Sequence, residues 1–344
     1  MSLVGIIANP VSARDIRRLV ANASGLQISD RANIVLRVLA SLGATGIRRV
    51  LMMPDKGGIS GLLTRALVRE RNLDRQPWPE VEFLDMPVSG TVHDSFRAAA
   101  RMAEVGVRAI VVLGGDGTSR AVARYCGHTP IAGLSTGTNN AFPELREPTI
   151  TGLAVGLYAT GAIAADEALR PNKVLEIEVN DGDQTDLALV DVAVTCERYV
   201  GARALWRTDN FRELFVTFAA PEAIGMSSIA GLLDPVGRDE AAGLHVRLSA
   251  PGEARQVLTA PIGPGMVSPV GIAGHQRLQP DHPYPLATAA GSIALDGERE
   301  IEFAPTDRVT VRLRTDRLFT VDVPRVMRAA ARERLLCRVT SGGA

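Results

Sequence analysis

One stretch of the chain combines residue types that suit phosphate chemistry, the Gly-Gly-Asp-Gly-Thr motif at 114–118. It directly follows the apolar run 109–113, which predicts a buried strand. Glycines lack a Cβ, so they let the main chain approach a ligand closely. A helix expected over 119–125 would point free N–H groups at an anion from the same place. Asp116 would stand at the carboxyl end of a strand, where open α/β sheets hold their sites, so the motif predicts phosphoryl transfer.

A simpler interpretation of the 114–118 motif is a tight strand-to-helix turn. In that case Asp116 caps the helix, since aspartate is a favoured N-cap residue. The glycines on both sides of the acid favour the phosphate interpretation, with Asp116 as the catalytic residue. The neighbours predicted to contact the phosphates are Gly114, Gly115, Gly117 and Thr118.

Hydroxyl and amide side chains gather in a second loop, 135–143, after the strand expected at 131–134. Such groups can hydrogen-bond the ribose or the phosphates of a nucleotide. Polar loops with Gly and Asn are also common turns, so this prediction depends on the pairing of the loop with the 114–118 motif. The residues assigned to nucleotide binding here are Thr136, Gly137, Thr138, Asn139 and Asn140.

A third polar segment begins at Asn9, after the strand expected at 4–8. Ser12 can donate a hydrogen bond to a phosphate, and Arg14 supplies positive charge. The alternative is a β-turn followed by a solvated basic segment. With that alternative open, Asn9, Ser12 and Arg14 join the predicted nucleotide site.

The first part of the chain alternates between strand and helix patterns. Helical periodicity extends over 32–42, 59–71 and 92–105, and further strands are expected at 50–53 and 81–86. This rhythm predicts an α/β domain with a mostly parallel sheet and helices on both faces.

The sequence pattern changes after a helix expected at 149–156. Short apolar or alternating runs, among them 174–179 and 187–195, continue to 318–323 with dense Gly and Pro punctuation, which predicts a β-sandwich. Asp296-Gly297 is a strong two-residue hairpin signal. Lys173 is expected in solvent at a strand start.

Three units are therefore predicted along the chain. They are a nucleotide-binding α/β domain (1–147), a β-sandwich substrate domain (148–323), and a C-terminal helix packing back on the first domain (324–344).

Bulk properties narrow the class of protein. With 344 residues, the chain exceeds the usual size of one core. A formal net charge of zero argues against a mainly electrostatic nucleic-acid binder. Three scattered cysteines give no disulfide framework or zinc spacing, which fits a reducing cytosol. Neither a signal peptide nor an apolar run long enough to span a membrane is expected, so the prediction is a cytoplasmic protein.

Four motifs together carry a family resemblance: Asn9-Pro10 with 14–18, the 114–118 motif, the Ser-Thr-Gly-Thr-Asn-Asn of 135–140, and the segment 222–231. The glycine motif and the 135–140 loop resemble the diacylglycerol kinase and NAD kinase superfamily. With the others, over nearly the whole chain, they resemble the acetoin-catabolism protein X family, which is ATP-NAD-kinase-like. The resemblance implies a nucleotide-binding α/β domain and a β-sandwich, with the active site between them.

Departures from the superfamily pattern concern the acceptor. NAD kinases carry an Asn-Asp or Asn-Glu pair that holds NAD, whereas the similar stretch here places Val190 before Asp191. Their Thr-Pro-Thr-Gly-Ser-Thr-Ala-Tyr loop has its nearest counterpart by position at 225–228. Lipid kinases favour Gly-Thr-Gly-Asn-Asp-Phe where this chain has 137–142. Asp191, Gly225 and Ser227 are thus the predicted substrate residues, in an acceptor half that has diverged.

The resemblance implies an ATP-dependent kinase that transfers a phosphoryl group to a hydroxyl, with ATP and Mg²⁺ as cofactors, NAD as the default acceptor, and a homo-oligomeric assembly. Asp116 would take the proton of the acceptor hydroxyl or help to hold the metal. One alternative is a lipid or small-polyol kinase, whose acyl groove would come from four apolar residues of the β domain. Another is a non-catalytic nucleotide-binding regulator linked to acetoin catabolism. The four groove residues are Phe211, Leu214, Phe215 and Phe218.

Overall fold

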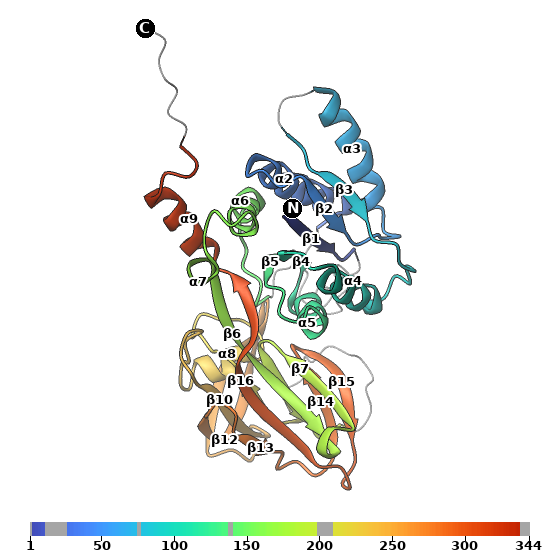
Figure 1. Ribbon diagram of the computed structural model, residues 1–344. Helices are drawn as coiled ribbons and strands as arrows, with labels where there is room; N and C mark the ends of the chain where they lie inside the picture. Colours follow the sequence, from blue (N-terminus) through green and yellow to red (C-terminus); the bar gives the residue numbers. More distant parts are fainter. Residues whose placement is uncertain (1, 11–25, 74–76, 137–139, 198–208, 338–344) are drawn as a thin grey trace.

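The computed structural model describes residues 2–10, 26–73, 77–136, 140–197 and 209–337. Over these residues the strands form two sheets. Figure 1 shows the helices grouped around one part of the molecule and a β-sandwich making up the other.

Parallel strands build the first half of the larger sheet, as the alternating pattern predicts. Their order is β3-β2-β1-β4-β5, and each neighbouring pair is parallel. The carboxyl ends of β1, β4 and β5 therefore meet at one edge of the sheet. The bounds of these strands are β1 (Leu3–Ala8), β2 (Arg49–Met52), β3 (Glu80–Phe83), β4 (Ala109–Gly114) and β5 (Ile131–Ser135).

Helices cover both faces of this parallel half. One apolar cluster joins one face to α2, α3, α6 and the C-terminal helix α9 (Val323–Arg332), and a second joins the opposite face to α4 and α5. The helices of the parallel half are α2 (Ile28–Ala44), α3 (Ile59–Leu73), α4 (Val92–Val105), α5 (Asp116–Tyr125) and α6 (Pro148–Ala159).

The same sheet continues beyond β5 in the order β16-β6-β7. β16 (Val309–Val321) meets β5 in parallel through the pair Thr320↔Ile131 and runs antiparallel to β6 (Leu169–Val179) along its length. β7 (Gln184–Ala188) closes this side, and β13 (Pro283–Pro285) pairs with β16. Two long strands thus run from the helical part of the molecule into the sandwich (Figure 1).

The second sheet is antiparallel throughout, with the order β11-β12-β10-β9-β8-β14-β15. It packs against β6 and β16 through a shared apolar cluster that includes Ile177, Phe215 and Val311. This arrangement confirms the predicted sandwich. Its strands are β8 (Asp191–Thr195), β9 (Phe211–Val216), β10 (Gly243–Ser249), β11 (Gln256–Gly263), β12 (Met266–Leu278), β14 (Gly291–Leu295) and β15 (Glu298–Phe303).

The predicted hairpin at Asp296-Gly297 is confirmed. Both residues have positive φ, 50° and 81°, and they connect β14 to β15 through the pair Leu295↔Glu298. Positive φ at both central positions is what a type I′ turn requires.

Two strand predictions were wrong in detail. The run 187–195 is not one strand, because the chain leaves β7 and enters β8 of the other sheet at Leu189–Val190. The backbone N–H groups of these two residues donate to the Asp296 carboxylate. Conversely, 309–313 and 318–323 belong mainly to the single strand β16, whose pairing is irregular between Arg314 and Leu318.

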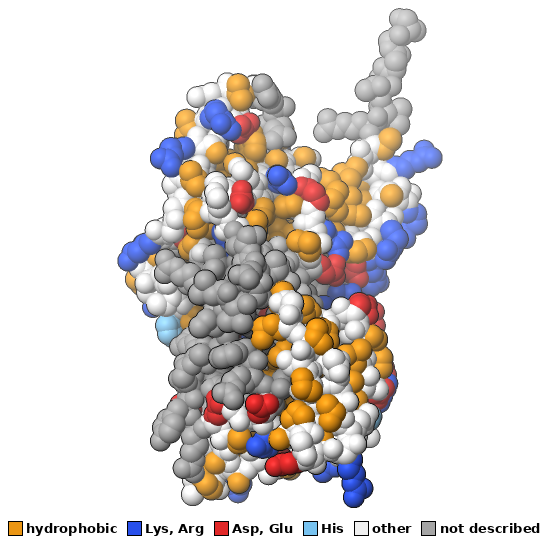
Figure 2. All heavy atoms as spheres, turned by 180° about the vertical axis from the view of Figure 1, so that it is seen from behind, with side chains coloured by type: hydrophobic (Ala, Val, Ile, Leu, Met, Phe, Trp, Pro, Cys, Tyr) orange, Lys and Arg blue, Asp and Glu red, His pale blue; other side chains and the backbone are white. Residues whose placement is uncertain are grey.

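The C-terminal helix α9 (Val323–Arg332) has two distinct faces. Val326, Ala329 and Ala330 are buried in the cluster shared with α6, while the arginines of the opposite face are exposed. Figure 2 shows these basic side chains gathered over α9. The division into three units at 147 and 323 stays a prediction. The remaining short elements are α7 (Ala165–Ala168), η2 (Asn180–Gly182) and α8 (Ser227–Gly231).

Within the residues that the structure describes, none of the helices combines the length and the apolar character needed to cross a membrane.

Candidate active site

Asp116 lies where β4 ends and α5 begins. Gly115 precedes it in an extended conformation, and Asp116 is the first helical residue, so it does not occupy the N-cap position. Its carboxylate accepts the N–H of Ala141 at 3.0 Å and that of Phe142 at 2.8 Å. The side chain thus ties the glycine motif to the loop that follows β5, which the interpretation of Asp116 as a helix cap does not predict.

The glycines of the motif allow these two loops to pack closely. A Cβ added to Gly114 would lie 2.4 Å from the Cβ of Thr118, and one added to Gly115 would lie 2.6 Å from the Oδ1 of Asn140. Asn140 also donates from its Nδ2 to the Ser135 hydroxyl at 2.8 Å. The sequence motifs at 114–118 and 135–143 are therefore in direct contact.

The end of β1 joins the same place. Asn9 donates from its Nδ2 to the Thr118 hydroxyl at 3.4 Å, and the backbone N–H of Thr136 donates to the carbonyl of Gly114 at 3.2 Å. The structure thus brings together Asn9, Gly114, Gly115, Gly117, Thr118, Thr136 and Asn140 around Asp116. Five other predicted nucleotide residues lie outside the described residues, and their assignment stays a prediction: Ser12, Arg14, Gly137, Thr138 and Asn139.

Arg31 of α2 belongs to this site and was missed in the sequence. Its side chain is fully buried, and its guanidinium donates to the carbonyl of Asn9 at 2.9 Å and to the Thr136 hydroxyl at 3.4 Å. A signal was present, because Arg31 continues the buried apolar face of Val35 and Val38 at helical spacing. An arginine on such a face indicates a buried partner.

A small cavity lies on the other side of Asp116, between the 141–142 loop and the sandwich. Its volume is about 20 Å³, and Asp191, Gly225 and Ser227 line it together with Asp116. All three predicted substrate residues are therefore placed beside the predicted catalytic residue. The rest of the lining comes from Ala141, Val190, Ile224, Met226, Ile262, Asp296 and Gly297.

Asp296 adds a second carboxylate to the cavity wall. It accepts the backbone N–H groups of Leu189, Val190 and Asp191 at 2.8–3.2 Å. Burial and, to a lesser extent, the negative charge of Asp116 raise the pKa of Asp296 to about 7, although Arg120 and the N–H donors oppose the shift. In the sequence, Asp296 is explained by the hairpin alone, so its position in the cavity was not predicted.

Arg120 connects α5 to the sandwich. Its guanidinium lies 3.0 Å from Glu300, 3.5 Å from Asp186 and 3.9 Å from Asp296, and its side chain is only 11% exposed. Arg124, one turn later, reaches Asp186 at 2.7 Å. These ion pairs hold the helix that carries Asp116 against the strands that carry the rest of the cavity.

Glu298, directly after the hairpin turn, also approaches the glycine motif. Its Oε1 lies 3.6 Å from the position that a Cβ on Gly117 would take. The sequence predicts only a hairpin turn at Asp296-Gly297, so the carboxylate of Glu298 is another missed member of the site.

Lys173 was wrongly predicted to be in solvent. It is 6% exposed, and its Nζ donates to the carbonyls of Gly237, Glu240 and Ala242 at 2.7–2.8 Å. Burial lowers the pKa of Lys173 to about 8. The acceptors come from a loop more than 60 residues away in sequence, so local pattern gave no sign of them.

The residues proposed for an acyl groove do not form one. Phe211, Leu214 and Phe215 are at most 1% exposed and belong to the sandwich core. The ring of Phe218 is covered by the Arg238 guanidinium at 3.8 Å. These side chains are therefore packing residues.

Comparisons with known proteins match both halves of the chain. Residues 4–163 match the family model of the ATP-NAD kinase N-terminal domain, and 173–316 match that of the acetoin catabolism protein X C-terminal domain. Acetoin catabolism protein X of Cupriavidus necator is 56% identical over 337 residues, which cover 97% of this chain and 94% of that protein.

A solved structure shares the fold at low sequence identity. Yeast NADH kinase, solved in complex with NADH, is 13% identical and superposes with a TM-score of 0.50, covering 100% of this chain and 90% of that one. A diacylglycerol kinase from Bacillus anthracis is 10% identical with a TM-score of 0.45, covering 93% and 96%. The first of these confirms the NAD-kinase-like α/β domain and its sandwich partner. Given its identity to the Cupriavidus protein over nearly the whole length, the chain belongs to the acetoin catabolism protein X family.

Proposed function

We propose that this protein is an ATP-dependent kinase that transfers a phosphoryl group to a hydroxyl. The observation that carries the proposal is the position of Asp116. Its carboxylate lies at the end of a parallel strand, beside a glycine motif, and faces a cavity that the sandwich completes. Phosphoryl transfer depends mainly on positioning and charge stabilisation, which such a boundary between two domains supplies.

The donor side of the proposed site is formed by the ends of β1, β4 and β5. The glycine motif and the start of α5 offer backbone N–H groups to phosphates. Asn9, Thr136 and Asn140 surround the motif with hydroxyl and amide groups. We assign ATP to this edge of the sheet.

Magnesium would reach this site with the nucleotide. Among the described residues, no three His, Cys, Asp or Glu side chains are grouped to hold a metal ion. This fits Mg²⁺, which is commonly held by substrate phosphates, waters and one or two carboxylates. Asp116, Asp296 and Glu298 are carboxylates close to the motif, and the ion would neutralise charge on the transferred group.

On the acceptor side, Asp116 would receive the proton of the attacking hydroxyl. Two backbone N–H groups fix the direction of its carboxylate, and the cavity beside it gives the hydroxyl a place to bind. A positioned base of this kind contributes about 10²–10⁴-fold to the rate. Asp191 and Ser227 are the polar side chains next to it that would orient the acceptor.

NAD is the first acceptor to test, because the matched domain is that of ATP-NAD kinases and a yeast NADH kinase shares the fold. Val190 sits in the cavity wall and offers no hydrogen bond there. A small polyol is the alternative acceptor, since the core positions of Phe211 and Phe215 remove the argument for an acyl groove.

The experiment is a screen for acceptor-dependent ADP formation. Purified protein is incubated with ATP and Mg²⁺ together with NAD, NADH, glycerol or a short-chain diacylglycerol. We expect ADP to accumulate only when an acceptor is present. Among the acceptors tested, we expect NAD to support ADP formation. ATP binding without turnover on any acceptor would contradict the kinase proposal and favour a nucleotide-binding regulator of acetoin catabolism.

A further inference from the structure

A second cavity lies in the gap between the parallel and the antiparallel halves of the large sheet. β5 and β16 share the pair Thr320↔Ile131, and the chain segment 142–146 lies alongside β5, with which it forms the parallel bridge Leu134↔Glu144. The cavity has a volume of about 60 Å³ and is bordered by this segment, the start of β6 and the start of α9. Its lining differs from that of the Asp116 cavity, although both lie along the same loop.

Arginines from three separate segments line this second cavity. Arg146 comes from the segment 142–146, Arg170 from β6, and Arg238 from the loop before β10. Only two carboxylates, Glu144 and Asp322, are among the lining residues. The three cations therefore outnumber the anions that the cavity wall itself provides.

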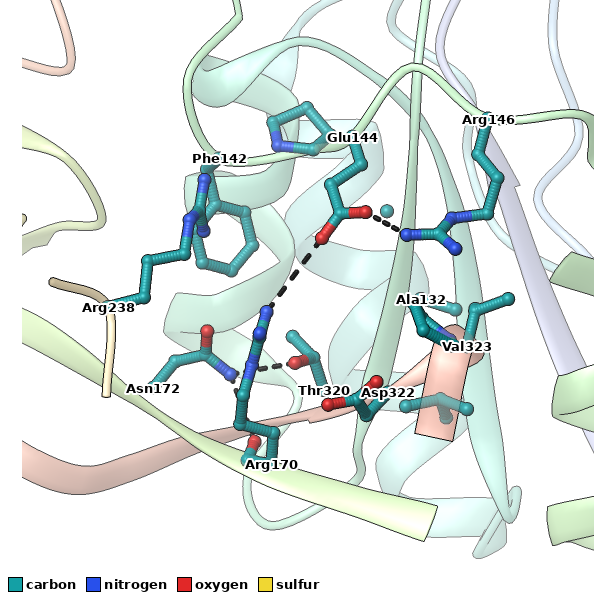
Figure 3. Close-up of a pocket in the computed structure, with 14 residues that line it drawn as sticks. Ala132, Phe142, Glu144, Arg146, Arg170, Asn172, Arg238, Thr320, Asp322 and Val323 are labelled. Carbon is teal, nitrogen blue, oxygen red and sulfur yellow. Dashed lines mark hydrogen bonds and ion pairs between the residues drawn. The ribbon is translucent and has the colours of Figure 1, made fainter. Parts of the chain in front are cut away.

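Glu144 serves two of these arginines at once. It is paired with Arg146, and its second oxygen lies 3.9 Å from Arg170, at the outer limit of an ion pair. Figure 3 shows Glu144 between the two guanidinium groups, while Arg238 lies beside the ring of Phe142. Because Glu144 itself is exposed, an incoming anion can take its place.

The other carboxylate is already engaged. Asp322 is the N-cap residue of α9 and accepts the backbone N–H of Arg325 at 3.0 Å. Within the described part of the chain, the buried Nε of Arg170 has no hydrogen-bond acceptor. An arginine fork with an open donor next to a cavity is the arrangement that recognises a planar or tetrahedral oxyanion.

Electrostatics agree with this geometry. Burial lowers the pKa of Arg146, and the nearby positive charge of Arg170 lowers it further, although Asp322 acts in the opposite direction. Burial and Arg170 likewise lower the pKa of Arg238 to about 10. The guanidinium groups thus repel each other in a partly desolvated place, and a bound anion would relieve this cost.

We propose that this cavity is a binding site for a small oxyanion, either a phosphate group or a carboxylate, held mainly by Arg146 and Arg170. The cavity volume admits one such group together with a few waters, but not a nucleotide. The bound anion replaces Glu144 as the partner of the two arginines.

The test is a titration of the full chain with inorganic phosphate and, separately, with acetate, followed by calorimetry and thermal unfolding. Sodium chloride keeps the ionic strength constant. We expect saturable binding of at least one of the two anions and a rise of a few degrees in the unfolding temperature. Arg170→Gln should weaken this binding about tenfold or more, since it removes charged hydrogen bonds.

Glu144→Gln separates the proposal from a purely structural ion cluster. Removing the competing carboxylate should tighten anion binding about tenfold, whereas a structural cluster would only lose stability. Arg308→Gln is the matched control, because Arg308 pairs with Asp181 on the exposed surface of the sandwich and lies outside the cavity. It should leave the titration unchanged.

Two results would overturn the proposal. One is the absence of saturable binding of either anion in both the wild type and Glu144→Gln. The other is binding that Arg170→Gln leaves intact, which would place the anion elsewhere, for example at the glycine motif. If Arg170→Gln fails to fold, the proposal is tested by the anion affinity of Arg170→Lys and by whether Glu144→Gln tightens or weakens anion binding.

Discussion

At the scale of single residues, glycine occupies positions 114 and 117 of the 114–118 motif for different reasons. Gly114 lies against Thr118, so that no side chain fits there. Gly117 lies within the first turn of α5, and a Cβ there would meet only Glu298 at 3.6 Å, an ordinary contact distance. Packing therefore demands glycine at 114, and function is the remaining reason for it at 117.

This difference predicts opposite effects on stability. Gly114→Ala should lower the free energy of unfolding by about 1–3 kcal/mol, as overpacking in a tight site does. Gly117→Ala should leave it unchanged or raise it by up to about 1 kcal/mol, because alanine favours the helix. Urea unfolding of the two variants measures this, and equal losses in both would contradict the packing argument.

The charge state of Asp296 depends on the fold. Burial raises its pKa from an ordinary value near 3.8 to about 7, so the folded protein holds a proton that the unfolded chain releases. The stabilisation is present below about pH 4 and is lost as the pH rises towards 7. It amounts to about 1.4 kcal/mol per pKa unit at most.

Asp296→Asn should remove this dependence. As the pH rises from 4.5 to 7.5, the free energy of unfolding of the wild type is expected to fall relative to that of the variant. Asp307→Asn is the control, because hydrogen bonds from Ala304 and Asn180 lower the pKa of that half-buried carboxyl and keep its titration below this range. If the difference in unfolding free energy between wild type and Asp296→Asn stays constant with pH, Asp296 is not protonated in the folded protein.

At the scale of elements, α5 carries both Asp116, the proposed catalytic residue, and the link to the sandwich. Arg120 contacts acidic side chains of β7 and β15 and of the turn between β14 and β15. The orientation of Asp116 relative to Asp191 and Asp296 depends on this link, since they come from different domains.

Arg120→Met should therefore destabilise the protein by about 3 kcal/mol, because it leaves the buried Asp296 without its cation and removes the partly buried pairs with Asp186 and Glu300. Arg101→Met, which removes an exposed pair with Glu104 on α4, should have no measurable effect. Urea unfolding compares the two, and similar stabilities for both variants would argue that the Arg120 contacts are dispensable.

Elements were predictable from the sequence where local pattern decides them. The strand–helix alternation and the Asp296-Gly297 turn are confirmed. The predicted strand 187–195 is broken because a carboxylate more than 100 residues away binds the N–H groups at its middle. Arg31 and Glu298 were missed, and Lys173 was misjudged, for the same reason: their partners are remote in sequence.

At the scale of the whole molecule, the site is a property of two domains together. The glycine motif and the 135–143 loop could be paired from sequence because the ends of adjacent parallel strands meet at one edge. Placing Asp191, Gly225 and Ser227 near them required the family resemblance, since no spacing rule connects the sandwich to that edge. The structure puts all three on one cavity with Asp116.

The measurement that tests the central claim most directly is transfer of label from γ-labelled ATP to acceptor by wild type, Asp116→Asn and Asp94→Asn. Asp94 is a matched control: it also accepts backbone N–H groups at a helix start, those of Ser89 and Gly90, but does not line the cavity. We predict transfer by wild type and Asp94→Asn, and a loss of about 10²-fold or more in Asp116→Asn, whose fold is retained. Undiminished transfer by Asp116→Asn would contradict the account.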